Sequence, residues 1–243
     1  MSKIIADRQK LQSEFLSPIA KIRPELVAID ADGSDLVVTV IDDANDTSLY
    51  ARHTVESISG IETIGLKSVE RLNKALSFAS EPTVTLEVGE RFATYNGPGL
   101  MFETPLLNET LISRIRLGLR PEMFDKFTFD FSFDLPVAMI DKIQKGRQFA
   151  AEADSLVFST TSTNMLRGTL EKNGAGSCDN ITFDLMALDR PLRQPYRVGI
   201  GLFSALTVFG ENVTVLLNED KKGFIFITQT PTTTLKYGVR TLK

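Results

Sequence analysis

One histidine and one cysteine are the residues that could act as a nucleophile, a general base or a soft metal ligand. His53 lies in the polar, strand-like stretch 50–54, and Cys178 has no second cysteine with which to form a zinc site. A Ser-His-Asp or Cys-His arrangement would have to use His53, and neither Cys178 nor a Gly-x-Ser-x-Gly turn offers a partner. We therefore interpret His53 as a solvated surface residue and expect no enzyme.

Glycine loops that bind phosphates or dinucleotides are also absent. The chain has no Gly-x-x-x-x-Gly-Lys-Ser/Thr motif, and the pair Gly199 and Gly201 lacks the third glycine of a dinucleotide loop. The acidic run 42–46 lacks the spacing of a calcium loop and suits a polar turn between strands. The residue types therefore predict no cofactor, although a metal site made of carboxylates alone remains an open alternative.

Lys and Arg gather on helix-like stretches of a chain whose net charge is −4. Lys67, Arg71 and Lys74 follow the spacing i, i+4, i+7 opposite an apolar stripe, and Lys142 and Lys145 share a face in the same way. For any one helix an ordinary solvated face is the alternative, but the joint pattern favours a binding surface. Lys and Arg that act without aromatic side chains reading the base edges suit loose, sequence-independent contact with phosphates.

The composition is that of a globular protein. Of 243 residues, 42% are hydrophobic and 24% are charged, and the length suits two domains. A single cysteine excludes an internal disulfide framework, and neither a signal peptide nor a membrane span is readable. We therefore expect a cytoplasmic protein that does not enter a membrane.

Hydrophobic periodicity predicts the same order of elements twice. A helix over 3–16, closed by Pro18, opens the first half, and a strand over 127–133 opens the second. After the first helix we expect strands at 26–30, 36–41 and 48–55, a helix at 66–79, and strands at 83–88, 92–95 and 100–104. After the opening strand of the second half we expect a helix at 135–150, strands at 156–160, 166–171 and 181–188, a helix at 200–209, and strands at 213–218, 223–228 and 237–241.

This duplication predicts an α+β fold of two similar domains, each with two helices packed on antiparallel sheets. The domains should span 1–107 and 127–243. Between them, 108–126 has weaker periodicity and is interpreted as an interdomain connector.

Two segments of the second half carry a resemblance to a known family. Residues 133–150, FDLPVAMIDKIQKGRQFA, have the layout of the helix that opens the second domain of a DNA polymerase sliding clamp. Residues 211–228, ENVTVLLNEDKKGFIFIT, resemble the closing hairpin of that domain. By element order the whole chain resembles the PCNA-like clamps, most closely the T4-type bacteriophage clamps, although its fourth helix is uncharged.

The resemblance implies the DNA clamp fold and a non-enzymatic role in DNA replication. Such a processivity factor encircles double-stranded DNA as a homotrimer, a ring in the host cell cytoplasm, and tethers a DNA polymerase after a clamp loader ATPase has opened it. Helices would line the hole and carry the phosphate contacts. The DNA-binding residues that follow are Lys10, Lys67, Arg71, Lys74, Lys142, Lys145 and Arg147.

Partners of clamps insert a short peptide with apolar anchors into a pocket near the connector and the final strands. By position, this pocket would use Ile112, Ile115, Leu117, Phe224, Val239 and Leu242. Core packing is the alternative for Phe224 and Val239. For the chain as a whole, the alternative is a β-rich structural or assembly protein of a phage virion, in which the helix charges serve solubility.

Overall fold

The computed structural model describes most of the chain. Cys178, Leu117 and residues 43–46 of the acidic run lie outside the described residues. The described residues are 2–42, 47–116, 124, 126, 128–173 and 179–242.

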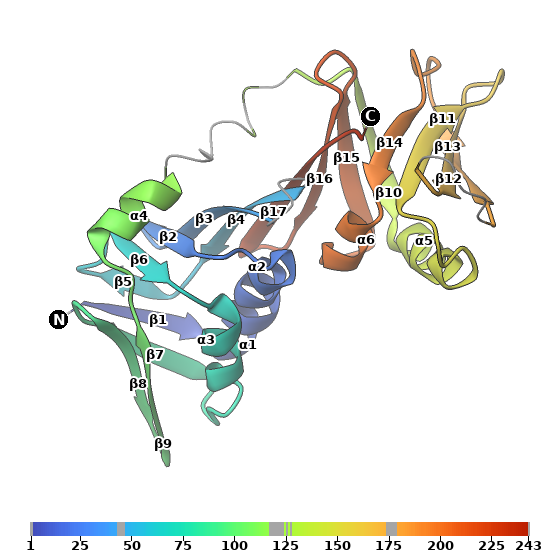
Figure 1. Ribbon diagram of the computed structural model, residues 1–243. Coiled ribbons are helices and arrows are strands. Elements are labelled where there is room, and N and C mark those ends of the chain that lie inside the picture. The colour runs from blue at the N-terminus through green and yellow to red at the C-terminus, as the bar shows by residue number, and fades with distance from the viewer. Residues whose placement is uncertain are drawn as a thin grey trace. The chain divides into compact units, whose positions relative to one another are not determined.

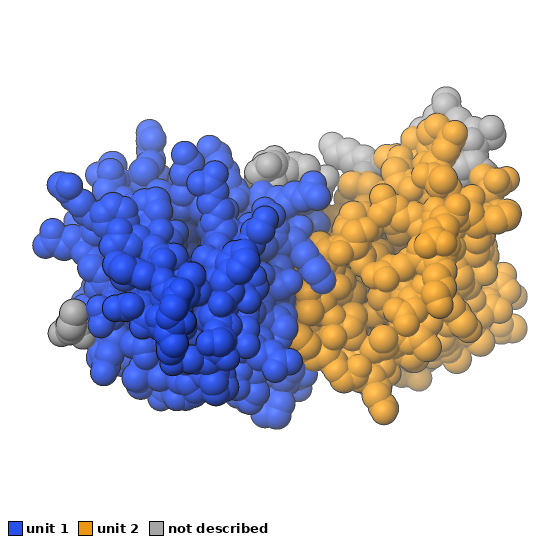
Figure 2. Space-filling view, turned by 90° about the horizontal axis from the view of Figure 1, so that it is seen from below, with its two compact units in different colours: residues 1–126, 229–236 blue, residues 127–228, 237–243 orange. Residues whose placement is uncertain are grey.

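The chain divides into two compact units (Figure 2). Unit 1 comprises 1–126 and 229–236, and unit 2 comprises 127–228 and 237–243. This division places the expected connector, 108–126, in unit 1. It also places a short stretch of the expected second domain in unit 1, so the domain boundaries read from the sequence stay a prediction.

Unit 1 contains an antiparallel sheet in the order β5-β1-β7-β8-β9. In β7, Val84 and Leu86 are buried while Thr85 and Glu87 are exposed, which is the period-two pattern of a strand with one face in the core. Strand β9 lies at an edge of the sheet, with β8 as its neighbour (Figure 1). The bounds are β1 Lys3–Asp7, β5 Ser57–Ser59, β7 Thr83–Val88, β8 Phe92–Gly97 and β9 Leu100–Pro105.

A second group of antiparallel strands in unit 1 has the order β4-β3-β2-β6. The turn between β2 and β3 is the predicted one: Asp32 pairs with Asp35, and Gly33 takes the positive φ of 64° that the tight turn requires. Strand β17 contributes 233–236 to this unit. The bounds are β2 Val27–Asp32, β3 Asp35–Ile41, β4 Thr47–Thr54, β6 Thr63–Leu66 and β17 Thr233–Arg240.

The first helix begins and ends later than the sequence predicts. Residues 3–7 form β1, because their alternating side chains are buried against β7. The helix begins after Asp7, whose side chain accepts a hydrogen bond from the Lys10 backbone N–H at 2.9 Å. Pro18 does not end it, because it lies in the first turn of α2, where its missing N–H costs little. The bounds are α1 Arg8–Lys10, η1 Leu11–Leu16 and α2 Ser17–Ile22.

Helix α3, Val69–Leu76, also begins later than predicted. Ser68 is its N-cap and accepts a hydrogen bond from the Arg71 backbone N–H at 3.2 Å. Leu66 is the last residue of β6, so Lys67 lies between a strand and the helix and not within a helix.

Unit 2 has antiparallel strands in the orders β10-β15-β16 and β13-β12-β11-β14. In β10 the aromatic side chains of Phe131 and Phe133 are buried and Ser132 is exposed, as the alternation of the sequence predicts, but the strand begins and ends later than the predicted 127–133. The bounds are β10 Phe131–Pro136, β11 Ser155–Thr160, β12 Met165–Glu171, β13 Ile181–Ala187, β14 Tyr196–Gly199, β15 Asn212–Asn218 and β16 Gly223–Gln229.

The two units repeat one order of elements. Each has a strand, a long helical segment, further strands, a short helix and three strands. In unit 2 the helices are α5, Val137–Phe149, and α6, Gly201–Ala205, close to their predicted positions. Figure 1 shows α1, α2 and α3 grouped together in unit 1, and α5 beside α6 in unit 2. The predicted α+β fold class is confirmed.

The expected connector contains a helix that the sequence did not predict, α4, Glu109–Arg116. It lies against β2 and β6, and Arg116 forms an ion pair with Asp30. Gly65 permits this close approach, because a Cβ at that position would lie 2.8 Å from Cγ1 of Ile112.

His53 is buried, so the prediction of a solvated histidine is wrong. Its exposed fraction is 1%, because β4 keeps its alternation to its end and position 53 faces inward. The ring stacks on Phe15 with centroids 5.6 Å apart, and Nδ1 lies 2.7 Å from Oγ1 of Thr233. Burial lowers the pKa of His53, because the charged imidazolium would lose its hydration.

Glu14 completes this polar cluster of unit 1. Its Oε2 accepts hydrogen bonds from the hydroxyl groups of Thr230, Thr232 and Thr233 at 2.8, 3.1 and 2.7 Å. Burial opposes ionisation of Glu14, but these hydrogen bonds outweigh it and lower the pKa of the carboxyl group. The cluster ties η1 to the turn that precedes β17.

We expect the free energy of unfolding to fall as the pH drops below 6.5, the ordinary pKa of histidine. The folded pKa of His53 is lowered, so the unfolded chain binds the proton more readily in this range. Glu14 and Asp35, whose pKa values are also lowered, act at lower pH. Urea denaturation between about pH 8 and about pH 5 measures the effect.

The matched variant is His53→Gln, which retains a group that can bond Thr233 but does not titrate. Its stability should change much less than that of the wild type over the same pH range. Equal slopes for the two proteins would contradict the assignment.

Candidate nucleic-acid interface

The outward face of α3 carries two of the predicted DNA-binding residues. Val69, Leu72 and Leu76 are buried, while Arg71 and Lys74 are exposed on the opposite side. This division follows from the amphipathic spacing of the helix. Lys67 is also exposed but precedes the N-cap, so it does not share the helical spacing that the sequence indicated.

Helix α5 presents a second basic face, in unit 2. Ile140, Ile143 and Gly146 are buried, while Lys142 and Lys145 are exposed. Burying a glycine brings the helix close to β13, since a Cβ at 146 would lie 2.7 Å from Cζ of Phe183.

The remaining predicted residues lie on other faces. Arg147 is exposed but turns toward α6, where its Nη1 donates to Oγ of Ser204 at 2.7 Å. Gln144 makes a parallel contact, donating to the Phe203 carbonyl at 2.6 Å. Lys10 is exposed at the end of α1 in unit 1. The five residues of α6 are uncharged, so this helix adds no cation.

The cations of these helices have no ion pairs within the part of the chain that the structure describes, unlike many cations on strands and loops. This applies to all seven predicted DNA-binding residues. A cation without a carboxylate partner can bind a phosphate without first breaking an internal pair. Among the described residues, cations that form ion pairs include Arg116 on α4 and, on strands and loops, Arg52, Arg167, Lys172, Arg190, Arg193 and Arg197.

The predicted pocket residues are divided between the units. Ile112 and Ile115 lie half-buried on α4 of unit 1, whereas Phe224, Val239 and Leu242 belong to unit 2. No single unit therefore brings the set together.

Phe224 is 1% exposed and lies within an aromatic core. Its ring centroid is 5.1 Å from that of Phe158, 6.2 Å from that of Tyr196 and 6.1 Å from that of Phe226. This environment supports the core-packing alternative for Phe224.

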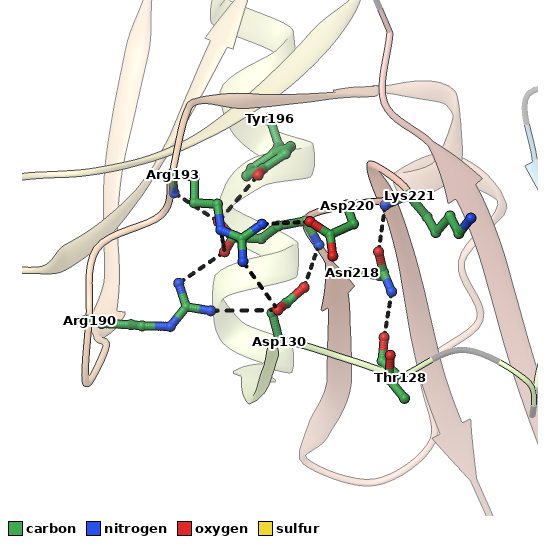
Figure 3. Close-up of polar contacts among 9 residues, drawn as sticks. Thr128, Asp130, Arg190, Arg193, Tyr196, Asn218, Asp220 and Lys221 are labelled. Atoms are coloured by element: carbon green, nitrogen blue, oxygen red, sulfur yellow. Dashed lines mark hydrogen bonds and ion pairs between the residues drawn. The ribbon is translucent and has the colours of Figure 1, made fainter.

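Unit 2 also contains a buried charge network that the sequence did not indicate (Figure 3). The Glu219 side chain is fully buried and accepts hydrogen bonds from Nη1 of Arg190, the backbone N–H of Arg193 and the hydroxyl of Tyr196 at 2.9, 2.8 and 3.2 Å. Asp130 accepts from the Glu219 backbone N–H at 2.8 Å. Burial and the negative charge of Glu219 raise the pKa of Tyr196 to about 12.

This network holds the loop before β14 against the turn between β15 and β16. Arg193 also donates to Asp220 at 2.6 Å, and the guanidinium of Arg190 lies 4.1 Å from the ring centre of Phe131. Its members are distant in the sequence, so no local motif could have revealed it. Because each buried acceptor already has a donor, we interpret the network as structural.

Clustered metal ligands and helices that could span a membrane are absent from the described residues. No group of three or more His, Cys, Asp or Glu side chains within them is placed to hold a metal ion. None of their helices is long and apolar enough to cross a membrane.

Comparisons with known proteins identify the fold. No protein-family model and no curated protein sequence matches the chain. Among solved structures, A. fulgidus PCNA bound to the C-terminal region of FEN-1 is similar over 100% of this chain and 99% of its own, with a TM-score of 0.76 and 14% identity.

Two bacterial structures are similar over 100% of this chain, which spans 65% of their length. They are the β subunit of DNA polymerase III from Thermotoga maritima, with a TM-score of 0.70 and 9% identity, and the DnaN sliding clamp from Bartonella birtlesii bound to griselimycin, with a TM-score of 0.68 and 13% identity. These likenesses confirm the PCNA-like sliding-clamp fold predicted from the sequence.

We expect Glu219→Ala to lower the free energy of unfolding by on the order of 3 kcal/mol, because the Arg190 guanidinium, the Arg193 backbone N–H and the buried Tyr196 hydroxyl lose the acceptor that Glu219 supplies. The matched control is Glu152→Ala, which removes the exposed ion pair with Lys172 and should change stability little. Urea denaturation measures both variants. A loss for Glu219→Ala no greater than that of the control would show that the network contributes no stability.

Proposed function

We propose that this chain, which has the sliding-clamp fold, is a sliding clamp: a subunit of a ring that encircles duplex DNA and tethers the replicative polymerase. The observation that carries the proposal is the pair of basic helix faces. Each unit presents one, on α3 or on α5, and its cations form no ion pair within the described chain. Such faces suit a polyanion that is bound without regard to sequence.

The charge distribution supports loose binding. The net charge of −4 disfavours DNA contact over the whole surface. We therefore expect contact at the few helix faces whose cations form no ion pair within the described residues. Phosphate contacts made by Lys and Arg release counterions and carry little sequence information. A ring held in this way stays on DNA by topology while its individual contacts are weak enough to permit sliding.

The proposed mechanism makes and breaks no covalent bond in this chain. Processivity follows because the closed ring must open before it can leave the DNA. Opening and loading require a separate clamp loader ATPase. We extend the proposal to a bacteriophage clamp that acts in the cytoplasm of the host cell.

We further propose that the ring is a homotrimer closed by edge strands. A head-to-tail ring needs two different surfaces that fit one another. Strand β9 in unit 1 and strand β13 in unit 2 each lie at an edge of a sheet, with unpaired backbone groups along one side. Each also leaves apolar side chains half-buried, among them Phe102 on β9 and Phe183 on β13, and a paired strand would cover these.

The polymerase and other partners would bind through a short peptide with apolar anchors. We keep Ile112, Ile115, Leu117 and Leu242 as candidate pocket residues, whereas Val239, at 7% exposure, is better assigned to the core. Phe224 is likewise better assigned to the core.

We expect the double variant Arg71→Glu/Lys74→Glu to weaken DNA-dependent stimulation of the cognate polymerase, and the triple variant that adds Lys67→Glu to abolish it. In direct titrations with a labelled duplex, the slope of log affinity against log salt should become shallower by about 0.9 for each phosphate that the variant no longer neutralises. The matched control is Lys3→Glu/Arg91→Glu, which reverses two exposed cations outside the helices of the same unit.

Equal effects of the two double variants would show that net charge alone matters and would contradict a helix-lined DNA site. If neither double variant alters DNA binding or polymerase stimulation, the rival function as a virion structural or assembly protein would be favoured.

The ring contact can be tested at Glu103, an exposed residue of β9. Leu106 N–H donates to the Arg91 carbonyl at 2.8 Å, and antiparallel pairs alternate in hydrogen bonding, so the N–H of Glu103 points away from β8. We expect Glu103→Pro to remove an intersubunit hydrogen bond and weaken the ring without breaking the sheet. Glu103→Ala, the control, removes the same side chain but keeps the N–H.

Light scattering over a range of protein concentrations measures the result. The wild type and Glu103→Ala should give a species of about 81 kDa, three times 26.9 kDa, and Glu103→Pro should give the monomer at the same concentrations. A wild-type protein that is monomeric at every concentration would leave ring assembly dependent on a loader. A trimer in all three proteins would exclude β9 as the contact.

A further inference from the structure

Two phenylalanine side chains stand exposed beside the basic helix faces. The exposed fraction is 70% for Phe78 and 64% for Phe149, the two highest values among the large hydrophobic residues that the structure describes. Leaving an aromatic ring in water forgoes the stabilisation that burial would provide. Neither ring stacks on another aromatic side chain within the described chain.

The two rings occupy the same position relative to two cations. In unit 1 the order is Arg71, Lys74, Phe78, and in unit 2 it is Lys142, Lys145, Phe149, so the spacing is i, i+3, i+7 in both. Residues at this spacing lie on one face of a helix.

The backbone keeps each ring in register with its cations. Phe149 is the last residue of α5. Phe78 follows the end of α3 in a further helical turn, in which its N–H donates to the Ala75 carbonyl at 3.2 Å. Each unit thus presents two cations and a ring along about 10 Å of one helix face.

We propose that each of these faces binds single-stranded DNA, with the two cations on neighbouring phosphates and the phenylalanine ring stacked on an unpaired base. This inference rests on the proposed function and extends it from duplex DNA to the strand beyond a duplex end. A basic surface combined with an aromatic ring is the arrangement that binds single strands without sequence preference.

The surroundings of the rings favour nucleic acid over a protein partner. Around Phe149, most exposed positions of α5 are polar, among them Asp141, Lys142, Lys145 and Gln148. A protein partner generally requires a contiguous apolar patch of several hundred Å², far more than one ring supplies. Single-stranded DNA is favoured over duplex because the bases of a duplex are already stacked on one another.

The functional consequence concerns the end of a duplex. A ring that meets unpaired template acquires stacking contacts that it lacks on the duplex. It is therefore retained at the junction where a polymerase works.

The test compares two labelled oligonucleotides of equal length at low salt, an oligo(dT) and an abasic strand that has the same phosphates but no bases. Wild-type protein should bind oligo(dT) more tightly. Phe78→Ala and Phe149→Ala should each weaken oligo(dT) binding about tenfold and leave abasic binding unchanged. Phe92→Ala, which removes a 43% exposed ring on β8, is the control and should change neither.

Phe→Ala variants that bind oligo(dT) as tightly as the wild type would overturn the inference. A wild-type protein that binds both strands equally would also overturn it, and a protein partner would then be the better occupant. Binding of a duplex of the same length distinguishes a failure of the single-strand inference from a failure of the clamp proposal. Retained duplex binding leaves the clamp proposal intact, whereas failure to bind duplex and both single strands at low salt would count against both.

Discussion

The basic faces of α3 and α5 depend on how firmly the opposite faces of these helices are buried. On α3, Val69 and Leu72 are at most 5% exposed, and on α5, Ile140 and Ile143 are at most 1% exposed. Protein interiors are packed as closely as organic crystals, so neither helix can turn about its axis without opening cavities. Flexible cationic side chains are thereby held at a constant spacing. A ligand can be held by weak contacts there because their geometry costs little to organise.

The elements that the sequence predicts well are those whose burial follows one simple period. Strand β7 is observed at 83–88, as predicted, because its side chains alternate strictly between core and solvent. Residues 3–7 were misassigned because Ile4 and Leu11 fall at a helical spacing, while the pairing that makes β1 a strand comes from β7, far along the chain. Helix α4 was missed because its packing depends on the bare backbone of Gly65.

The features of the candidate site also differ in whether a simple sequence period predicts them. Helical periodicity predicted the faces that carry Arg71 and Lys142, but it could not show that Phe78 and Phe149 remain uncovered, because exposure at a helix end depends on what packs beside it. The burial of His53 could not be read from the sequence, because its neighbours in the chain are polar. The network around Glu219 joins segments about 90 residues apart, a separation that no local pattern can bridge.

Gly146 has a consequence that extends beyond its own helix. With no side chain there, α5 lies directly on β13, and Phe183 fills the space that a Cβ would occupy. The helix that carries Lys142 and Lys145 and the strand at the edge of the sheet therefore form a single rigid element. Interiors of low compressibility transmit strain, so a displacement of that strand by a neighbouring subunit of the proposed ring would be passed to the helix. In the proposed ring, mechanical tension between subunits would in this way reach the helix face that carries the cations.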